Sequence, residues 1–83
     1  MGKSDVNKEE LQNCFGQVLR HARNNVGLSQ EKLAFDTGLD RTYISLLERG
    51  LRTPSLYTLM LISKHLDISV SSMVADVEAI YEV

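Results

Sequence analysis

Apolar residues recur along most of the chain at the spacing of amphipathic helices, in several separate segments. The first segment has apolar side chains at i, i+4, i+7 and i+11, which share one helical face. These positions are Leu11, Phe15, Val18 and Ala22, with Cys14 and Leu19 beside them. The pattern predicts a helix from Leu11 to about Asn25. Gly27 follows it, and glycine tolerates the left-handed geometry that commonly ends a helix.

The apolar pattern changes phase between Gln30 and Arg49, which predicts two short helices joined by a tight turn. The two apolar runs consist of Leu33 with Ala34 and of Ile44 with Leu47. Gly38 lies between them, where its freedom to adopt a positive φ suits a chain that reverses within a few residues. Ser29 and Asp40 precede the two helices, and short side-chain oxygens at such positions cap free amides. This stretch is therefore predicted to be a helix-turn-helix.

Two further helices are predicted after a loop at residues 50–54, which contains the single proline of the chain. Ser55 and Ser69 are their expected caps. The inward face of the fourth helix is predicted to comprise Leu56, Leu59, Ile62, Ser63 and Leu66. The wide apolar stripe of the fifth comprises Val70, Met73, Val74, Val77, Ile80 and Tyr81. With a frayed start at residues 1–6, the expected fold class is all-α, with five helices in a single domain spanning 1–83.

A set of residues at fixed spacing resembles a known family. Counting from Gln30, a small residue stands fifth, glycine ninth, a branched apolar residue fifteenth and an apolar residue eighteenth. Those residues are Ala34, Gly38, Ile44 and Leu47, flanked by GLSQ at 27–30, ERG at 48–50, PSL at 54–56 and DISVSSM at 67–73. Together they resemble the Cro/C1-type (XRE family) helix-turn-helix regulators over roughly residues 15–75. The resemblance implies a compact, lambda-repressor-like DNA-binding domain.

The second helix of the motif has the composition expected of a helix that reads bases. At 100° per residue, Ile44, Leu47 and Leu51 define its core side, and the opposite side is polar or short. The expected base contacts are Arg41, Thr42, Ser45 and Leu46. Arg41 offers two parallel donors to a guanine, and its alternative is an ion pair with Asp36 or Asp40. Solvent exposure is the alternative for Thr42 and Ser45, and packing against the first helix of the motif or against Tyr43 is the alternative for Leu46.

The DNA backbone is expected to be contacted from the ends of both helices of the motif. The residues predicted to do so are Gln30, Tyr43, Arg49 and Arg52. The family resemblance implies that Gln30 contacts a phosphate. Its side chain could instead brace the second helix of the motif, which is the helix expected to read bases and is called the recognition helix below. The alternative for Tyr43 is partial burial against the first helix of the motif, and the alternative for Arg49 and Arg52 is a position on a solvated surface. The resemblance also implies a partly buried structural ion pair between Arg23 and Glu48.

Charge is distributed unevenly along the chain, which has a net charge of −2. Residues 20–52 contain six basic and four acidic side chains, whereas from residue 53 onward one lysine opposes four acids. The middle is thus basic and the tail acidic, which suits a domain with one face toward phosphates. The single cysteine, Cys14, lies in an apolar stripe, and no His or Cys pair has metal-ligand spacing. We therefore expect neither an enzyme nor a metal, cofactor or small-molecule site.

The fourth and fifth helices carry more apolar residues than a short monomer can bury. The expected homodimer interface comprises Tyr57, Met60, Leu61, Met73, Val77, Ile80 and Tyr81. With no signal segment or membrane span, we expect a cytoplasmic regulator that binds an inverted-repeat operator as a homodimer. The DRTYIS segment followed by LERG is most similar to restriction-modification controller proteins. The alternatives are a phage Cro-like repressor, an antitoxin, or a protein-interaction module that does not bind DNA; RNA polymerase is a further candidate partner.

Overall fold

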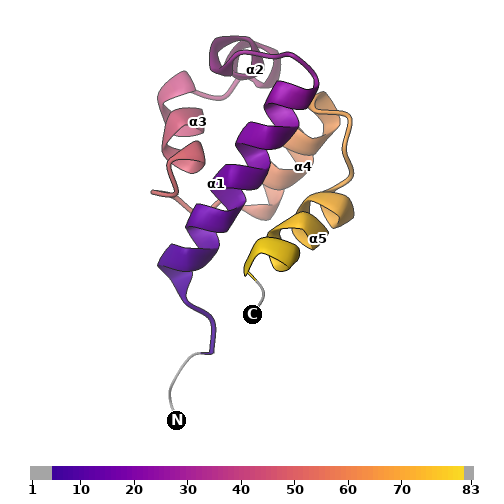
Figure 1. Cartoon of the computed structure of the whole chain (residues 1–83). Helices are drawn as coiled ribbons and strands as arrows, with labels where there is room; N and C mark the ends of the chain where they lie inside the picture. The colour runs from indigo at the N-terminus through magenta and orange to yellow at the C-terminus, as the bar shows by residue number, and fades with distance from the viewer. Residues whose placement is uncertain (1–4, 82–83) are drawn as a thin grey trace.

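A computed structural model describes residues 5–81 of the chain. In it the helices begin and end close to the positions predicted from the sequence. They are α1 (Lys8–Asn25), α2 (Gln30–Thr37), α3 (Arg41–Glu48), α4 (Leu56–His65) and α5 (Val70–Tyr81). No strand occurs within these described residues. The all-α, five-helix prediction is confirmed (Figure 1).

Short polar side chains cap the helices at the positions that the sequence predicts. The hydroxyls of Ser29 and Ser55 accept hydrogen bonds from the amides of Lys32 and Thr58, each at 3.0 Å. The Asp40 carboxylate accepts one from the Thr42 amide at the start of α3, also at 3.0 Å. These bonds satisfy backbone donors that have no partner inside the helix.

The first helix starts three residues earlier than its apolar stripe predicts. Asn7 caps it, because its side-chain oxygen accepts a hydrogen bond from the Glu10 amide at 2.8 Å. Two acidic residues then occupy the first turn, where they interact favourably with the positive end of the helix dipole. Of the start expected to be frayed, residues 1–4 lie outside the described residues, and Asp5 and Val6 are exposed.

Helix α1 runs through the middle of the molecule, with α3 on one side and α5 on the other (Figure 1). Helix α2 packs against α3 and α4. The largest fully buried side chains come from all five helices and are Leu19, Leu33, Ile44, Leu47, Ile62 and Met73. A single core therefore holds the two helices of the motif against the other three.

Two leucines predicted to face the core are instead exposed. Leu51 is 51% exposed because α3 ends at Glu48, so the helical spacing used to predict its orientation no longer applies. Leu56 is 70% exposed at the first position of α4, one turn before Leu59 reaches the core. Both errors arise at helix ends, where the periodic pattern loses its meaning.

Part of the apolar surface predicted to be left over is buried within the monomer. Met73 is 0% exposed and Val77 is 7% exposed, because α5 packs along α1 and directs both side chains into the core. The prediction that these two residues form free surface is wrong. Tyr81 is half-buried against the same core, and its hydroxyl accepts a hydrogen bond from the Asn7 amide at 2.8 Å.

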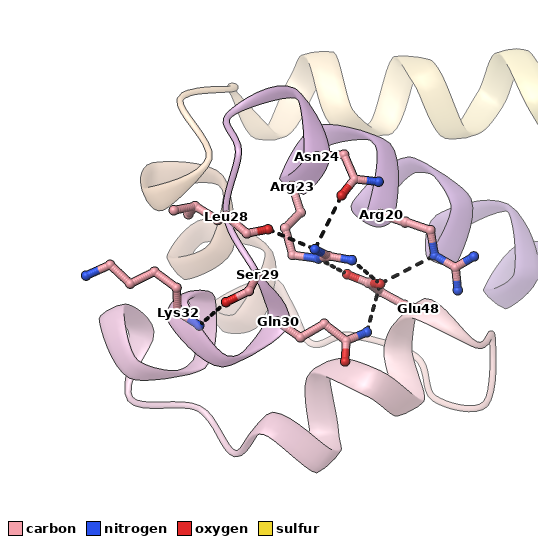
Figure 2. A network of polar contacts seen from close by, with 8 residues as sticks. All are labelled: Arg20, Arg23, Asn24, Leu28, Ser29, Gln30, Lys32 and Glu48. Carbon is pink, nitrogen blue, oxygen red and sulfur yellow. Dashed lines mark hydrogen bonds and ion pairs between the residues drawn. The ribbon is translucent and has the colours of Figure 1, made fainter.

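A buried carboxylate joins three helices. The Glu48 side chain is 0% exposed, and Arg23 donates to its two oxygens from Nε at 2.6 Å and from Nη2 at 2.9 Å (Figure 2). The Gln30 amide donates at 3.0 Å, and Arg20 Nε lies 3.5 Å from the same oxygen, Oε1. Arg23 Nη1 also donates to the Leu28 carbonyl at 2.8 Å, in the link between α1 and α2. The structure thus contains the Arg23–Glu48 pair that the family resemblance implies, within a larger network.

Burial acts to raise the pKa of the Glu48 carboxyl, but the hydrogen bonds from Arg23 and Gln30 and the charge of Arg23 outweigh it. The pKa of Glu48 therefore lies below its ordinary value. The hydrogen bond to Glu48 in turn raises the pKa of the Arg23 guanidinium. Both groups are charged at neutral pH, as a tightly bonded pair requires.

Helix α1 can approach the end of α3 only because Gly16 has no side chain. A Cβ atom at this position would lie 2.5 Å from the carbonyl oxygen of Glu48 and 2.8 Å from that of Leu47. Such distances are shorter than van der Waals contact, and the clashing atoms belong to the backbone, so a side chain cannot move to relieve them. The sequence pattern did not single out this glycine.

Replacing Arg23 with alanine should lower the free energy of unfolding by about 3 kcal/mol, because the Glu48 charge would stay buried without its main partner. Urea denaturation followed by circular dichroism measures this loss. Arg52→Ala is the matched control, since Arg52 is exposed, and should change stability by less than about 0.5 kcal/mol. Equal losses in the two variants would contradict a stabilising role for the pair.

The contribution of the Glu48 charge should also depend on pH. Because its pKa is lowered in the folded state, the contribution is present at neutral pH and is lost as the pH falls from about 4.3 through the folded pKa. The stability difference between the native chain and Glu48→Gln should therefore narrow on acidification over this range. A difference that stays constant down to pH 3 would show that the carboxylate charge is not responsible.

Gly16→Ala should destabilise the fold by roughly 1–3 kcal/mol through overpacking. The direction of this change in stability is informative, because alanine normally stabilises a helix by about 1 kcal/mol relative to glycine. Gln17→Ala, at the exposed neighbouring position of α1, should be nearly neutral. Thermal unfolding compares the two, and a Gly16→Ala variant as stable as the native chain would contradict the close approach of α1 and α3.

Candidate nucleic-acid interface

The outward face of α3 combines a cation with short side chains. Ile44 and Leu47 are fully buried, which turns the opposite side of the helix outward. On that side Arg41 and Thr42 are exposed, and Ser45 is half-buried. Arg41 is the first residue of α3, directly after the Asp40 cap. The helix therefore presents a long cationic side chain at the end that typically enters a major groove first.

Arg41 is available to a ligand. Among residues 5–81 its side chain forms no hydrogen bond and no ion pair. Both acids proposed as alternative partners are engaged elsewhere: Asp36 contacts Lys32 Nζ at 3.0 Å, and Asp40 caps the Thr42 amide. The alternative interpretation of Arg41, an ion pair on a solvated surface, has no support in this arrangement.

The other residues predicted to read bases have different surroundings. The hydroxyls of Thr42 and Ser45 form no hydrogen bond within the described part of the chain, so both are free to contact a ligand. Leu46 is half-buried and is absent from the apolar side chains that pack against the core. Tyr43 is half-buried and does pack against the core. A backbone contact by Tyr43 would therefore use the edge of a partly buried ring.

The Gln30 side chain braces the recognition helix. Its Nε2 donates to Glu48 at the end of α3, which is the second of its two predicted roles. Gln30 is also the first residue of α2, where free amides and the helix dipole favour an anion. Bracing engages the amide nitrogen, and the amide oxygen has no hydrogen-bond partner among the described residues.

Two exposed cations follow the recognition helix. Arg49 forms the C-cap of α3 through its backbone amide, and its side chain has no partner within residues 5–81. Arg52 lies in the next loop and donates from Nη1 to the neighbouring Leu51 carbonyl at 3.2 Å. With Arg41 at the start of the helix, cations flank α3 at both ends.

Sequence reasoning missed two features near this face. Phe35 on α2 is 81% exposed, and Lys32 Nζ lies 5.5 Å from its ring centroid. Arg20 contributes to the Glu48 network, although its sequence position suggested no role. The spacing of Arg20 and Arg23, three residues apart on one helix, was the available signal, because such residues share a face.

The described residues offer little support for other chemistry. No group of three or more His, Cys, Asp or Glu side chains within residues 5–81 is arranged to hold a metal ion. Cys14 is buried in the core. None of the helices that the structure describes combines the length and apolar character needed to cross a bilayer.

Comparison with known proteins relates this geometry to a family. A helix-turn-helix family model matches residues 19–72, which is more than half of the chain and includes α2 and α3 completely. The control protein C.BamHI of Bacillus amyloliquefaciens is 51% identical over 55 residues, covering 65% of this chain and 68% of that protein.

Solved structures agree with the sequence comparison. The restriction-modification controller protein C.AhdI from Aeromonas hydrophila has a TM-score of 0.72 and 45% identity, covering 75% of this chain and 94% of that chain. The controller protein C.Esp1396I, solved as a tetramer in complex with its natural 35 base-pair operator, has a TM-score of 0.75 and 34% identity. That match covers 86% of this chain and 93% of the other. The chain therefore belongs to the Cro/C1-type helix-turn-helix family of DNA-binding transcriptional regulators, and restriction-modification controller proteins are among its relatives.

Proposed function

We propose that this protein is a restriction-modification controller that binds an inverted-repeat DNA operator as a homodimer. The observation that carries the proposal is the outward face of α3, where an unpaired arginine stands beside free hydroxyls on a helix held by the core. Membership of a regulator family and the similarity to controller proteins support the same function. A location in the cytoplasm follows from DNA as the partner.

In this proposal Arg41 reads a guanine by donating to its O6 and N7 atoms in the major groove. Thr42 and Ser45 bond base edges or nearby phosphates, and Leu46 contacts a thymine methyl group. These four side chains project from one face of a single short helix, so they reach neighbouring base pairs of one half-site. The Glu48 network fixes the orientation of that helix before DNA binds.

Contacts to the phosphates position the domain without reading sequence. Gln30 at the start of α2 and Tyr43 on α3 contact one side of the groove. Arg49 and Arg52 contact the backbone beyond the other end of α3. Each phosphate neutralised by a cation releases counterions, so affinity should fall steeply as salt rises.

The homodimer forms through apolar residues that the monomer leaves uncovered. Tyr57 is 70% exposed and Met60 is 54% exposed on α4, and Ile80 is 47% exposed on α5. Leu61 is half-buried beside them, and Tyr81 adds its half-buried ring. A two-fold axis through this surface pairs two recognition helices about one helical turn of DNA apart, roughly 34 Å.

Three other functions compete with this one. A phage Cro-like repressor or an antitoxin would use the same DNA-binding face. A restriction endonuclease gene found beside the gene of this protein would favour the controller. A protein-interaction module would use the apolar surface without binding DNA, and its binding would respond little to salt. RNA polymerase is a further partner if the bound protein activates transcription.

Arg41→Ala should weaken binding to the operator by about 1–3 kcal/mol and relax the base preference at one position. The probe is the inverted repeat located by footprinting upstream of the gene itself, compared with unrelated DNA of equal length. Arg52→Ala is the matched control: it removes one arginine near the same face, and should weaken both DNAs equally. If Arg41→Ala also weakened both DNAs equally, Arg41 would contact the backbone instead.

Met60→Asp and Ile80→Asp should each convert the dimer to monomers and reduce operator affinity, because burying a charge against an apolar partner surface is unfavourable. Sedimentation equilibrium measures the association state. Phe35→Asp is the control, since Phe35 is exposed on α2 and should leave the dimer intact. A dimer that persists in both the α4 and the α5 variant would refute the proposed interface.

A further inference from the structure

A polar groove of about 440 Å³ lies along α1 beside the end of α3. Gln17, Arg20 and Asn24 of α1 form one wall, Arg49 lies across from them, and Glu48 contributes its buried carboxylate. The groove is separate from the outward face of α3, and none of the predicted base contacts lines it. The sequence offered a role for only two of its charged residues, Glu48 and Arg49.

The groove carries an excess of positive charge. Arg23 already pairs with Glu48 through two short hydrogen bonds, which neutralises the single carboxylate. Arg20 approaches that carboxylate only through Nε, at 3.5 Å, and its side chain is 56% exposed. Its two terminal nitrogens point away from Glu48 (Figure 2). The guanidinium of Arg49 has no partner among residues 5–81. Three arginines, Arg20, Arg23 and Arg49, therefore lie in or beside the groove with a single carboxylate, which leaves a net positive charge.

Arg20, which lines the groove, lies close to the start of α2. Arg20 Nε and Gln30 Nε2 both contact the same oxygen atom, Glu48 Oε1 (Figure 2). The guanidinium is thus a close neighbour of the first residue of α2, where backbone amides favour an anion. A polyanion that crosses the start of α2 and the end of α3 would pass the groove.

We propose that this groove binds a phosphate of the DNA backbone, with Arg20 as its principal donor. The Gln17 and Asn24 side-chain amides supply further N–H donors, and Arg49 contributes from the opposite wall. The inference rests on the DNA binding proposed above and extends the contact surface from the helix-turn-helix to α1. It also gives Arg20 a function that its single long contact with Glu48 does not explain.

Two neighbouring asparagines allow a matched test. Asn24 and Asn25 both lie in the last turn of α1 and are exposed, but only Asn24 lines the polar groove, whereas Asn25 lines another surface depression. Asn→Asp at either position adds one negative charge at nearly the same distance from the helix end. Asn24→Asp also keeps the oxygen that accepts from Arg23 Nη1 at 3.4 Å.

Asn24→Asp should weaken binding to the operator and to unrelated DNA by the same factor, roughly tenfold near physiological salt, through repulsion of a bound phosphate. Asn25→Asp should change either affinity by less than about twofold. Fluorescence anisotropy with labelled duplexes measures both, and circular dichroism melting confirms that the variants fold. Indistinguishable DNA affinities for the two folded variants would overturn the proposal. The groove would then bind no DNA phosphate, whatever other anion it accepts.

Arg20→Gln provides a second, independent readout. Losing one phosphate contact should reduce the slope of log affinity against log salt concentration by about 0.9, while Lys64→Gln, on α4, should leave the slope unchanged. An unaltered slope in Arg20→Gln would overturn the role of Arg20. If the native protein bound no DNA at all, the proposed function would fail together with this inference. If the native protein bound DNA and the groove variants showed the same affinity and salt dependence, only this inference would be overturned.

Discussion

The arrangement of the motif depends on one buried charge, the carboxylate of Glu48. Taking a carboxylate out of water is costly, and the cost is offset only when its oxygens receive several well-placed donors. Arg23 and Arg20 reach it from α1, and Gln30 reaches it from α2. Because hydrogen bonds are directional, this set of donors is satisfied in only one relative placement of the three helices. Apolar contacts alone would tolerate small rotations and shifts of α3.

Gly16 sets the distance at which this network operates. The backbone of α1 lies so close to the carbonyls of Leu47 and Glu48 that no side chain fits between them. A larger residue would push the end of α3 outward and lengthen the bonds between α1 and the buried carboxylate. Side chains that read bases must be held to a fraction of an ångström to discriminate between base pairs. The precision proposed for Arg41 is thus set from the inner side of α3, by Gly16 and by the network around Glu48.

Local patterns predicted the helices well because their causes are local. A capping oxygen at Ser29 or Asp40 acts within three residues, and helical periodicity identifies α1 from its own sequence. What the pattern could not predict was which of several apolar faces the fold would cover. Met73 and Val77 are buried because α5 packs along α1, a contact between segments far apart in the sequence. The charge excess around Arg20 and the need for Gly16 likewise appear only after α1 meets α3.

The apolar surface left exposed on α4 and α5 differs in its residues from the surface that the sequence suggested. Of the residues predicted to form the interface, Met73 and Val77 are committed to the core, Tyr57, Met60 and Ile80 are exposed, and Leu61 and Tyr81 are partly available. Leu56 and Val74 are also exposed on α4 and α5. Association through this surface must offset the loss of translational and rotational freedom, so dissociation at low protein concentration is expected. When two associated protomers bind two linked half-sites, binding of the first protomer raises the effective concentration of the second at its own half-site. Under the proposed function, occupancy of the operator would rise steeply with protein concentration, which is the behaviour needed of a regulator that controls its own synthesis.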